Sequence, residues 1–87
     1  MNEQNILEEL LAVLEANNVK IRNEPLGGKG GGLCVIKGEN FFFIDSQAAT
    51  AESAAICAQA VSELIDIDRI YLKPQTREFI EKNKAAG

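Results

Sequence analysis

Residues 24–45 read EPLGGKGGGLCVIKGENFFFID, and the fold of the chain depends on the structure of this stretch. Five glycines and one lysine make up residues 27–32, and two apolar runs follow on either side of Gly38. A glycine-rich loop of this kind either binds a phosphate with its backbone amides or leads the chain into a β-hairpin. The residues around it favour the hairpin.

The two apolar runs, residues 33–37 and 41–45, are predicted to be the paired strands of that hairpin. Gly38 at the first central position of a two-residue Gly38-Glu39 turn is typical of type II′, which matches the twist of paired strands. The predicted pairs are Ile36 with Phe41 and Cys34 with Phe43 on one face, and Val35 with Phe42 and Leu33 with Ile44 on the other. Both faces are apolar, so we expect one to be covered by this chain's helices and the other by a further helix or a second subunit. The expected interface residues are Phe41, Phe42 and Phe43.

The glycines do not match a known phosphate-binding pattern. Gly28-Lys29 is followed by Gly30 instead of Ser or Thr, and no glycine stands five residues earlier, so the Walker A motif fails. A dinucleotide loop would also open a helix, whereas this one opens a strand. We therefore expect a conformational role, with glycine supplying positive φ angles. The alternative is a nest of amides that binds a carboxylate or phosphate, with these ligand-binding residues: Gly28, Lys29, Gly30, Gly31 and Asp45.

The rest of the chain predicts an α+β domain. Residues 4–16 repeat apolar side chains at helical spacing, residues 19–22 alternate as an edge strand does, and residues 50–64 form an alanine-rich helix. Residues 66–72 are either a last strand or a turn, and Pro74 begins a third helix that ends near Lys82. We expect one compact domain over residues 1–82, with a mainly antiparallel sheet of three or four strands packed by helices, and a frayed tail at residues 83–87.

Few residues in the sequence are suited to catalysis. The chain has no histidine, which removes the usual general base near neutral pH and the commonest zinc ligand. Cys34 and Cys57 are far apart, so we expect reduced core thiols and no metal site. Asp45 follows a strand and precedes a helix, where it caps that helix or serves as a catalytic acid, and the cap is favoured. No catalytic residue, metal or cofactor is expected, and an enzyme is disfavoured.

The charge balance limits the partners. The net charge is −4 and the isoelectric point about 4.7, so the chain as a whole repels a phosphate backbone. No apolar run is long enough to cross a bilayer, and the first eighteen residues carry four glutamates and no basic residue, unlike a secretory signal. We expect a cytoplasmic protein that binds neither nucleic acid nor membranes.

Two resemblances follow from these features. The sequence GGGLC at residues 30–34, the run ending in Ile44-Asp45 and the later Leu72-Lys73-Pro74 with Arg77 resemble a group of short bacterial proteins of unknown function. The hairpin that ends in Ile-Asp before a helix is distantly similar to the metallopeptidase family that cleaves phage immunity repressors. That family carries HExxH on the following helix, where this chain has AQAVS at residues 58–62, so the resemblance implies shared architecture without zinc peptidase activity.

The expected function is that of a small noncatalytic interaction module that self-associates, with a homodimer or another protein as its partner. The alternative is a small-molecule or anion-binding domain that uses residues 27–32 and Asp45.

Overall fold

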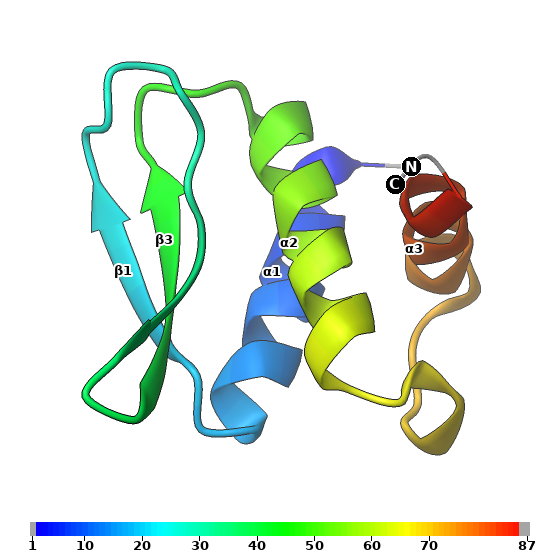
Figure 1. Ribbon diagram of the computed structural model, residues 1–87. Coiled ribbons are helices and arrows are strands. Elements are labelled where there is room, and N and C mark those ends of the chain that lie inside the picture. Colours follow the sequence, from blue (N-terminus) through cyan, green and yellow to red (C-terminus); the bar gives the residue numbers. More distant parts are fainter. Residues whose placement is uncertain (1, 86–87) are drawn as a thin grey trace.

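Residues 2–85 fold into three helices and three strands in the order α-β-β-β-α-α, which is the predicted order without the optional strand between the last two helices (Figure 1). The computed structural model describes residues 2–85. The helices are α1 (Glu3–Ala16), α2 (Thr50–Leu64) and α3 (Pro74–Ala85), and the strands are β1 (Lys20–Glu24), β2 (Gly32–Ile36) and β3 (Glu39–Asp45). The predicted α+β fold class is therefore confirmed.

Local signals account for both ends of α1. The side chain of Asn2 accepts a hydrogen bond from the backbone N–H of Gln4 at 2.8 Å and thereby caps the start of the helix. Past the other end of the helix, Asn18 adopts a φ of 66°, a left-handed conformation that asparagine tolerates better than most residues. The chain then turns directly into β1.

The third helix is longer than the sequence predicts. It begins at Pro74, as expected, but continues beyond Lys82 to Ala85. The side chain of Asn83 donates a hydrogen bond to the carbonyl oxygen of Phe79 at 2.8 Å, within the last turns of this helix. Of the tail predicted at residues 83–87, the first three residues are thus helical, and residues 86–87 lie outside the described residues.

The sheet is mixed, which corrects the prediction of a mainly antiparallel sheet. Its order is β1-β3-β2, with β3 antiparallel to β2 and parallel to β1. Residues 25–31 connect β1 to β2, the two outer strands of the sheet, and therefore cross a width of about 10 Å. The position between these two strands is occupied by β3, the second strand of the hairpin. The parallel pair arises because this loop is long enough to cross the end of the sheet.

The hairpin turns one residue earlier than predicted. Its central residues are Lys37 and Gly38, with φ of 52° and 80°, which is the type I′ geometry and not type II′. The observed pairs are Gly32 with Phe43, Leu33 with Phe42, Cys34 with Phe41, Val35 with Asn40 and Ile36 with Glu39. The register is thus shifted by two residues. Because side chains alternate with a period of two, the shift leaves every side chain on the face predicted for it.

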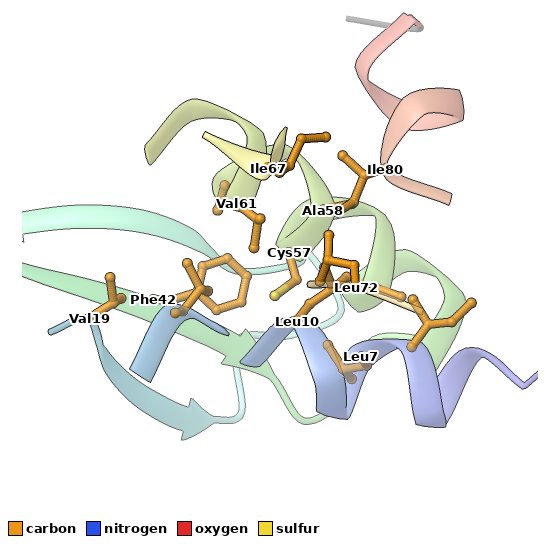
Figure 2. Close-up of a cluster of buried hydrophobic side chains, with 14 residues drawn as sticks. Leu7, Leu10, Val19, Phe42, Cys57, Ala58, Val61, Ile67, Leu72 and Ile80 are labelled. Atoms are coloured by element: carbon orange, nitrogen blue, oxygen red, sulfur yellow. The ribbon is translucent and has the colours of Figure 1, made fainter. Parts of the chain in front are cut away.

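The molecule has three layers (Figure 1). The sheet lies against the pair α1 and α2, and α3 packs on the far side of that pair. Phe42 points from the central strand into the core, toward Cys57 and Val61 of α2 (Figure 2). The buried hydrophobic residues are Ile6, Leu7, Leu10, Leu14, Val19, Phe42, Ala54, Cys57, Ala58, Ala60, Val61, Ile67, Leu72 and Ile80. No helix among residues 2–85 covers the other face of the sheet (Figure 1).

The segment between α2 and α3 is a turn, which decides between the two structures predicted for residues 66–72. A short 3-10 helix, η1 (Ile67–Arg69), begins at Asp66, whose side chain accepts a hydrogen bond from the N–H of Asp68 at 3.1 Å. The guanidinium of Arg77 then donates to the carbonyl oxygens of Ile67 at 2.8 Å and Ile70 at 3.2 Å. The first turn of α3 thereby holds η1 in place.

Candidate functional site

The carboxylate of Asp45 closes the glycine loop. Its Oδ1 atom accepts hydrogen bonds from the backbone N–H groups of Leu26 and Gln47, each at 2.9 Å, and its Oδ2 atom accepts one from Gly30 at 3.0 Å. The side chain is buried, with 1% of the residue exposed. Backbone amides of the loop that follows β1 and of the segment that follows β3 therefore converge on one carboxylate.

The parallel pairing of β1 and β3 explains this convergence. Glu24 and Asp45 are register partners at the carboxyl ends of the two strands, so the loop leaving β1 begins beside Asp45. A hydrogen bond from Ser46 N to Glu24 O at 3.0 Å continues the pairing by one step. Gly27 N donates to the side-chain Oε1 of Gln47 at 2.7 Å, which ties the loop to the segment before α2.

Asp45 is ionised in this setting. Burial acts to raise the pKa of its carboxyl, but hydrogen bonds from the backbone amides of Leu26, Gln47, Gly30 and Gly28 outweigh burial and hold the pKa below the ordinary value of 3.8. Amide donors favour the charged form because they stabilise the negative oxygens and offer nothing to a protonated one.

The predicted ligand-binding residues are brought together, but the Asp45 carboxylate is hydrogen-bonded to the loop's own backbone. Gly28, Gly30, Gly31 and Lys29 surround the end of the sheet where Asp45 lies, and the amide of Gly30 is already used by that carboxylate. Lys29 is exposed and forms no ion pair with any other described residue. The loop is thus a nest that holds the chain's own anion, and an external anion would approach a buried negative charge.

Asp45 does not cap α2, contrary to the favoured prediction. The N-cap residue is Ala49, which offers no side-chain hydrogen bond. Asp45 instead bonds the amide two residues on, at Gln47, in an Asx turn. The sequence places Asp45 correctly at the strand end but does not reveal the loop amides that bind it, because they come from a distant segment.

Two glycines in the loop are required by close packing. A Cβ atom on Gly31 would lie 1.6 Å from the backbone oxygen of Phe43, so a side chain has no room there. Gly30 has a φ of 80°, and a Cβ atom on it would lie 2.8 Å from the Cδ1 atom of Ile56. The predicted conformational role of the glycines therefore has a steric basis at these two positions.

A groove of about 220 Å³ lies beside Asp45, between α1, the strand ends and the start of α2. Its polar residues include Gln4, Asn23, Ser46, Thr50 and Ser53. Among the described residues, no buried side-chain polar atom lacks a hydrogen-bond partner, and no group of three potential metal ligands occurs. The groove therefore contains no buried group left free to act on a ligand.

The open face of the sheet carries two aromatic rings. Phe41 and Phe43 stack with ring centroids 6.3 Å apart, while Phe42 between them is 1% exposed and lies in the core. Of the three predicted interface residues, two thus lie on the open face and Phe42 does not. Cys34 and Ile36 of β2 share this open face and are exposed.

The basic residues of β1 lie beside these rings but are paired with acids. The Lys20 ammonium lies 5.7 Å from the centroid of Phe41 and 2.7 Å from a carboxylate oxygen of Glu39. Arg22 lies 3.1 Å from Glu24. The sequence predicts an edge strand here, but only the sheet order shows which aromatic residues this strand adjoins. Because each cation has an acidic neighbour, this face carries little net positive charge.

The outer strand β2 differs from β1 in having no charged residue, since it reads GLCVI. Val35, whose side chain is on the helix side of the sheet, is 64% exposed, and Ile36 is 42% exposed. Next to this strand, between it and α2, is a groove of about 340 Å³ whose lining includes Leu33, Ile56 and Glu63. This apolar edge is a second candidate surface.

The two cysteines have different environments, which corrects the expectation that both are buried. Cys34 is exposed on β2, whereas Cys57 is buried on α2. Burial raises the pKa of the Cys57 thiol to about 12. Cys57 is therefore a packing residue, and Cys34 is accessible to reagents.

None of the helices among residues 2–85 has the length and apolar character needed to span a bilayer. Comparison of the chain with protein-family models, with curated protein sequences and with solved structures gave no match.

Proposed function

We propose that the chain is a small noncatalytic interaction module that associates with a second copy of itself through its three-stranded sheet. The observation that carries this proposal is the sheet's uncovered apolar surface. Cys34 and Ile36 are exposed on the open face of the outer strand, and Phe41 and Phe43 lie half-buried on the same face. Apolar residues gathered on one uncovered surface of a small protein are typical of an interaction site.

The chemistry of the glycine loop, residues 27–32, supports an interaction module over a ligand-binding domain. Binding of an anion by residues 27–32 would require the loop to release the carboxylate of Asp45 or to hold a second negative charge beside it. Titration of the protein with inorganic phosphate tests this alternative, with Lys29→Ala as the variant. Saturable binding that Lys29→Ala abolishes would favour the anion-binding domain.

A cytoplasmic setting is part of the proposal. An accessible thiol such as Cys34 stays reduced in the cytosol, whereas an oxidising compartment converts exposed thiols to disulfides. The net charge of −4 makes another protein surface a better partner than nucleic acid.

The mass of the native protein as a function of concentration tests the proposal. Sedimentation equilibrium and native mass spectrometry should give twice the chain mass of 9.5 kDa, with dissociation on dilution. A mass of one chain from micromolar to millimolar concentration would refute self-association. Phe42→Asp is unsuitable as an interface variant, because this residue is 1% exposed and its replacement would unfold the core.

A further inference from the structure

We infer that the second copy binds edge to edge along β2, in antiparallel orientation, with Cys34 on the twofold axis. This inference rests on the proposed self-association and specifies its surface. The product is one continuous sheet in which the three strands of each copy are joined at their uncharged edges.

The two edges of the sheet differ in their protection against pairing. Edge strands of soluble proteins are commonly guarded by charged side chains or proline. β1 has three charged residues, Lys20, Arg22 and Glu24, whereas β2 has no charged residue and no proline. Of the two edges, β2 is therefore the one suited to accept another strand.

The hairpin turn determines which backbone groups of β2 are free. Because Lys37 and Gly38 form a two-residue turn, Ile36 and Glu39 are the hydrogen-bonded pair that closes the hairpin. Hydrogen-bonded pairs alternate along an antiparallel ladder, so Cys34 also bonds β3. The N–H and C=O groups of Leu33 and Val35 consequently point away from the sheet.

These outward groups limit the possible registers of an antiparallel β2 pair. When the two strands pair with Cys34 opposite Cys34, Leu33 of each copy lies opposite Val35 of the other. Centring on Leu33 would oppose Val35 to Gly31, and centring on Val35 would oppose Leu33 to Lys37. Only the first register gives both apolar residues an apolar partner, so it is the one we infer.

The helix side of the edge fits this register. Val35 is 64% exposed, and the groove beside β2 is lined by the apolar Leu33, Ile56 and Ala60 and by the polar Gln59 and Glu63. With Leu33 opposite Val35 of the second copy, that exposed valine lies over the apolar part of this groove, and the symmetry fills both grooves at once. A single surface therefore supplies both the projecting side chain and the groove that receives it.

The charges near the edge are complementary in the same register. Lys37 follows β2 and would stand opposite Gly31 of the second copy, which lines the same groove as Glu63. Neither Lys37 nor Glu63 forms an ion pair with another described residue. The pairing of one with the other across the axis would favour this register and oppose some of the repulsion between two chains of net charge −4.

Disulfide formation at Cys34 tests the register. The two Cys34 residues would be a non-hydrogen-bonded pair with Cα atoms about 4.5 Å apart, within the range of a disulfide. Treatment with diamide should join two chains: the two thiols lose two protons and two electrons, which reduce diamide to the hydrazine. We expect rapid conversion to a covalent dimer, with Cys57 unmodified because it is buried.

Matched cysteine variants make this test specific. In a Cys34→Ser background, Lys20→Cys on the other edge should give little covalent dimer, although the Lys20 side chain is 57% exposed. Cys34→Ser alone should keep the native mass of two chains. Equal crosslinking from both positions would show collision between free molecules and overturn the inferred edge.

A charged residue introduced on β2 tests the inferred interface independently of cysteine crosslinking. Val35→Lys should raise the dissociation constant of the dimer by about tenfold or more, because it brings a cation into the apolar contact. Tyr71→Lys is the control, since Tyr71 is 83% exposed in the segment before α3. Circular dichroism should show both variants folded.

The outcomes separate the inference from the proposal beneath it. A wild-type protein that is monomeric at every concentration refutes both. A wild-type dimer that Val35→Lys leaves intact and that does not crosslink at Cys34 retains self-association and overturns the β2 edge. A dimer lost in Val35→Lys and crosslinked at Cys34 supports both.

Discussion

At the scale of single residues, Asp45 joins three parts of the chain. Its carboxylate binds amides of the glycine loop and of the segment before α2, and it does so while buried at the end of β3. A buried carboxylate is stable only when its charge is met by donors, so the loop and the charge depend on each other.

We predict that Asp45→Asn destabilises the protein at neutral pH. The loss in stability should exceed that of the control variant Asp66→Asn, since Asp66 is exposed. The amide of an asparagine would present an NH₂ group to a backbone N–H, such as that of Gly30, which leaves two donors facing each other. Urea denaturation of the two variants checks this. Equal stabilities would mean that the loop amides contribute nothing.

The same residue gives a pH dependence. The pKa of Asp45 is lowered in the folded state relative to 3.8, so its contribution to stability is complete above 3.8 and is lost as the pH falls through the folded-state pKa. The difference in stability between wild type and Asp45→Asn should therefore shrink below this pH. Denaturation curves from pH 7 to pH 2 would show a constant difference if Asp45 had no lowered pKa.

Gly31 is limited by space. We predict that Gly31→Ala destabilises the protein by about 3 kcal/mol or more, because its Cβ atom would lie 1.6 Å from the Phe43 oxygen and the backbone must move. Gly27 has a φ of 78° and open space around it, so Gly27→Ala should lose only about 1 kcal/mol. Thermal denaturation of the pair separates steric overlap from conformational preference.

At the scale of elements, the hairpin has one position that its residue type does not suit. Lys37 adopts a φ of 52° at the first central position of a type I′ turn, where asparagine is preferred. We predict that Lys37→Asn stabilises the protein by about 0.5 to 1 kcal/mol. Thermal unfolding checks the gain, and a loss would indicate that the Lys37 side chain has a stabilising contact.

The docking of α3 depends on a residue of α1 that the sequence does not single out. One carboxylate oxygen of Glu9 accepts a hydrogen bond from the hydroxyl of Thr76, and the other accepts one from the backbone N–H of Lys73 at 3.2 Å. Thr76 is 1% exposed. Glu9 therefore acts as a capping residue for the start of α3 from another helix.

We predict that Glu9→Ala and Thr76→Val each destabilise the protein by about 1 to 2 kcal/mol, and that the losses are not additive in the double variant. A double-mutant cycle from urea denaturation measures the coupling. Glu8→Ala is the matched control, because Glu8 is exposed and bonds only Gln4 on its own helix among the described residues. Additive losses would exclude a direct interaction.

At the scale of the whole molecule, the three layers share a single core. Within this core, Cys57 of α2 lies beside Phe42 of the sheet (Figure 2). The exposure of this thiol requires the layers to separate. Its rate of modification therefore reports global opening, whereas that of Cys34 reports the folded surface.

We predict that a thiol reagent such as DTNB modifies one of the two cysteines rapidly in the native protein and both in denaturant. Cys57 is buried and its pKa is raised to about 12, so little reactive thiolate is present. Cys34→Ser should remove the fast reaction, and Cys57→Ala should leave it. Two fast reactions in the native wild type would contradict the buried position of Cys57.

The sequence by itself determined the features that depend on neighbours along the chain. The bounds of α2, the cap of α1, the proline at the start of α3 and the existence of the hairpin follow from periodicity and from contacts a few residues apart. The faces of the hairpin were also predicted correctly despite the error in its register, because a shift of two residues preserves alternation.

Only the tertiary structure decided what lies beside what. The parallel pairing of β1 with β3, the bond from Leu26 to Asp45 across 19 residues and that from Thr76 to Glu9 across 67 join segments whose own sequences do not specify each other. Residue types indicate which groups need a partner, such as a carboxylate at a strand end. Which group provides the partner depends on how the loops bring the elements together, since hydrogen bonds form wherever packing places a donor beside an acceptor.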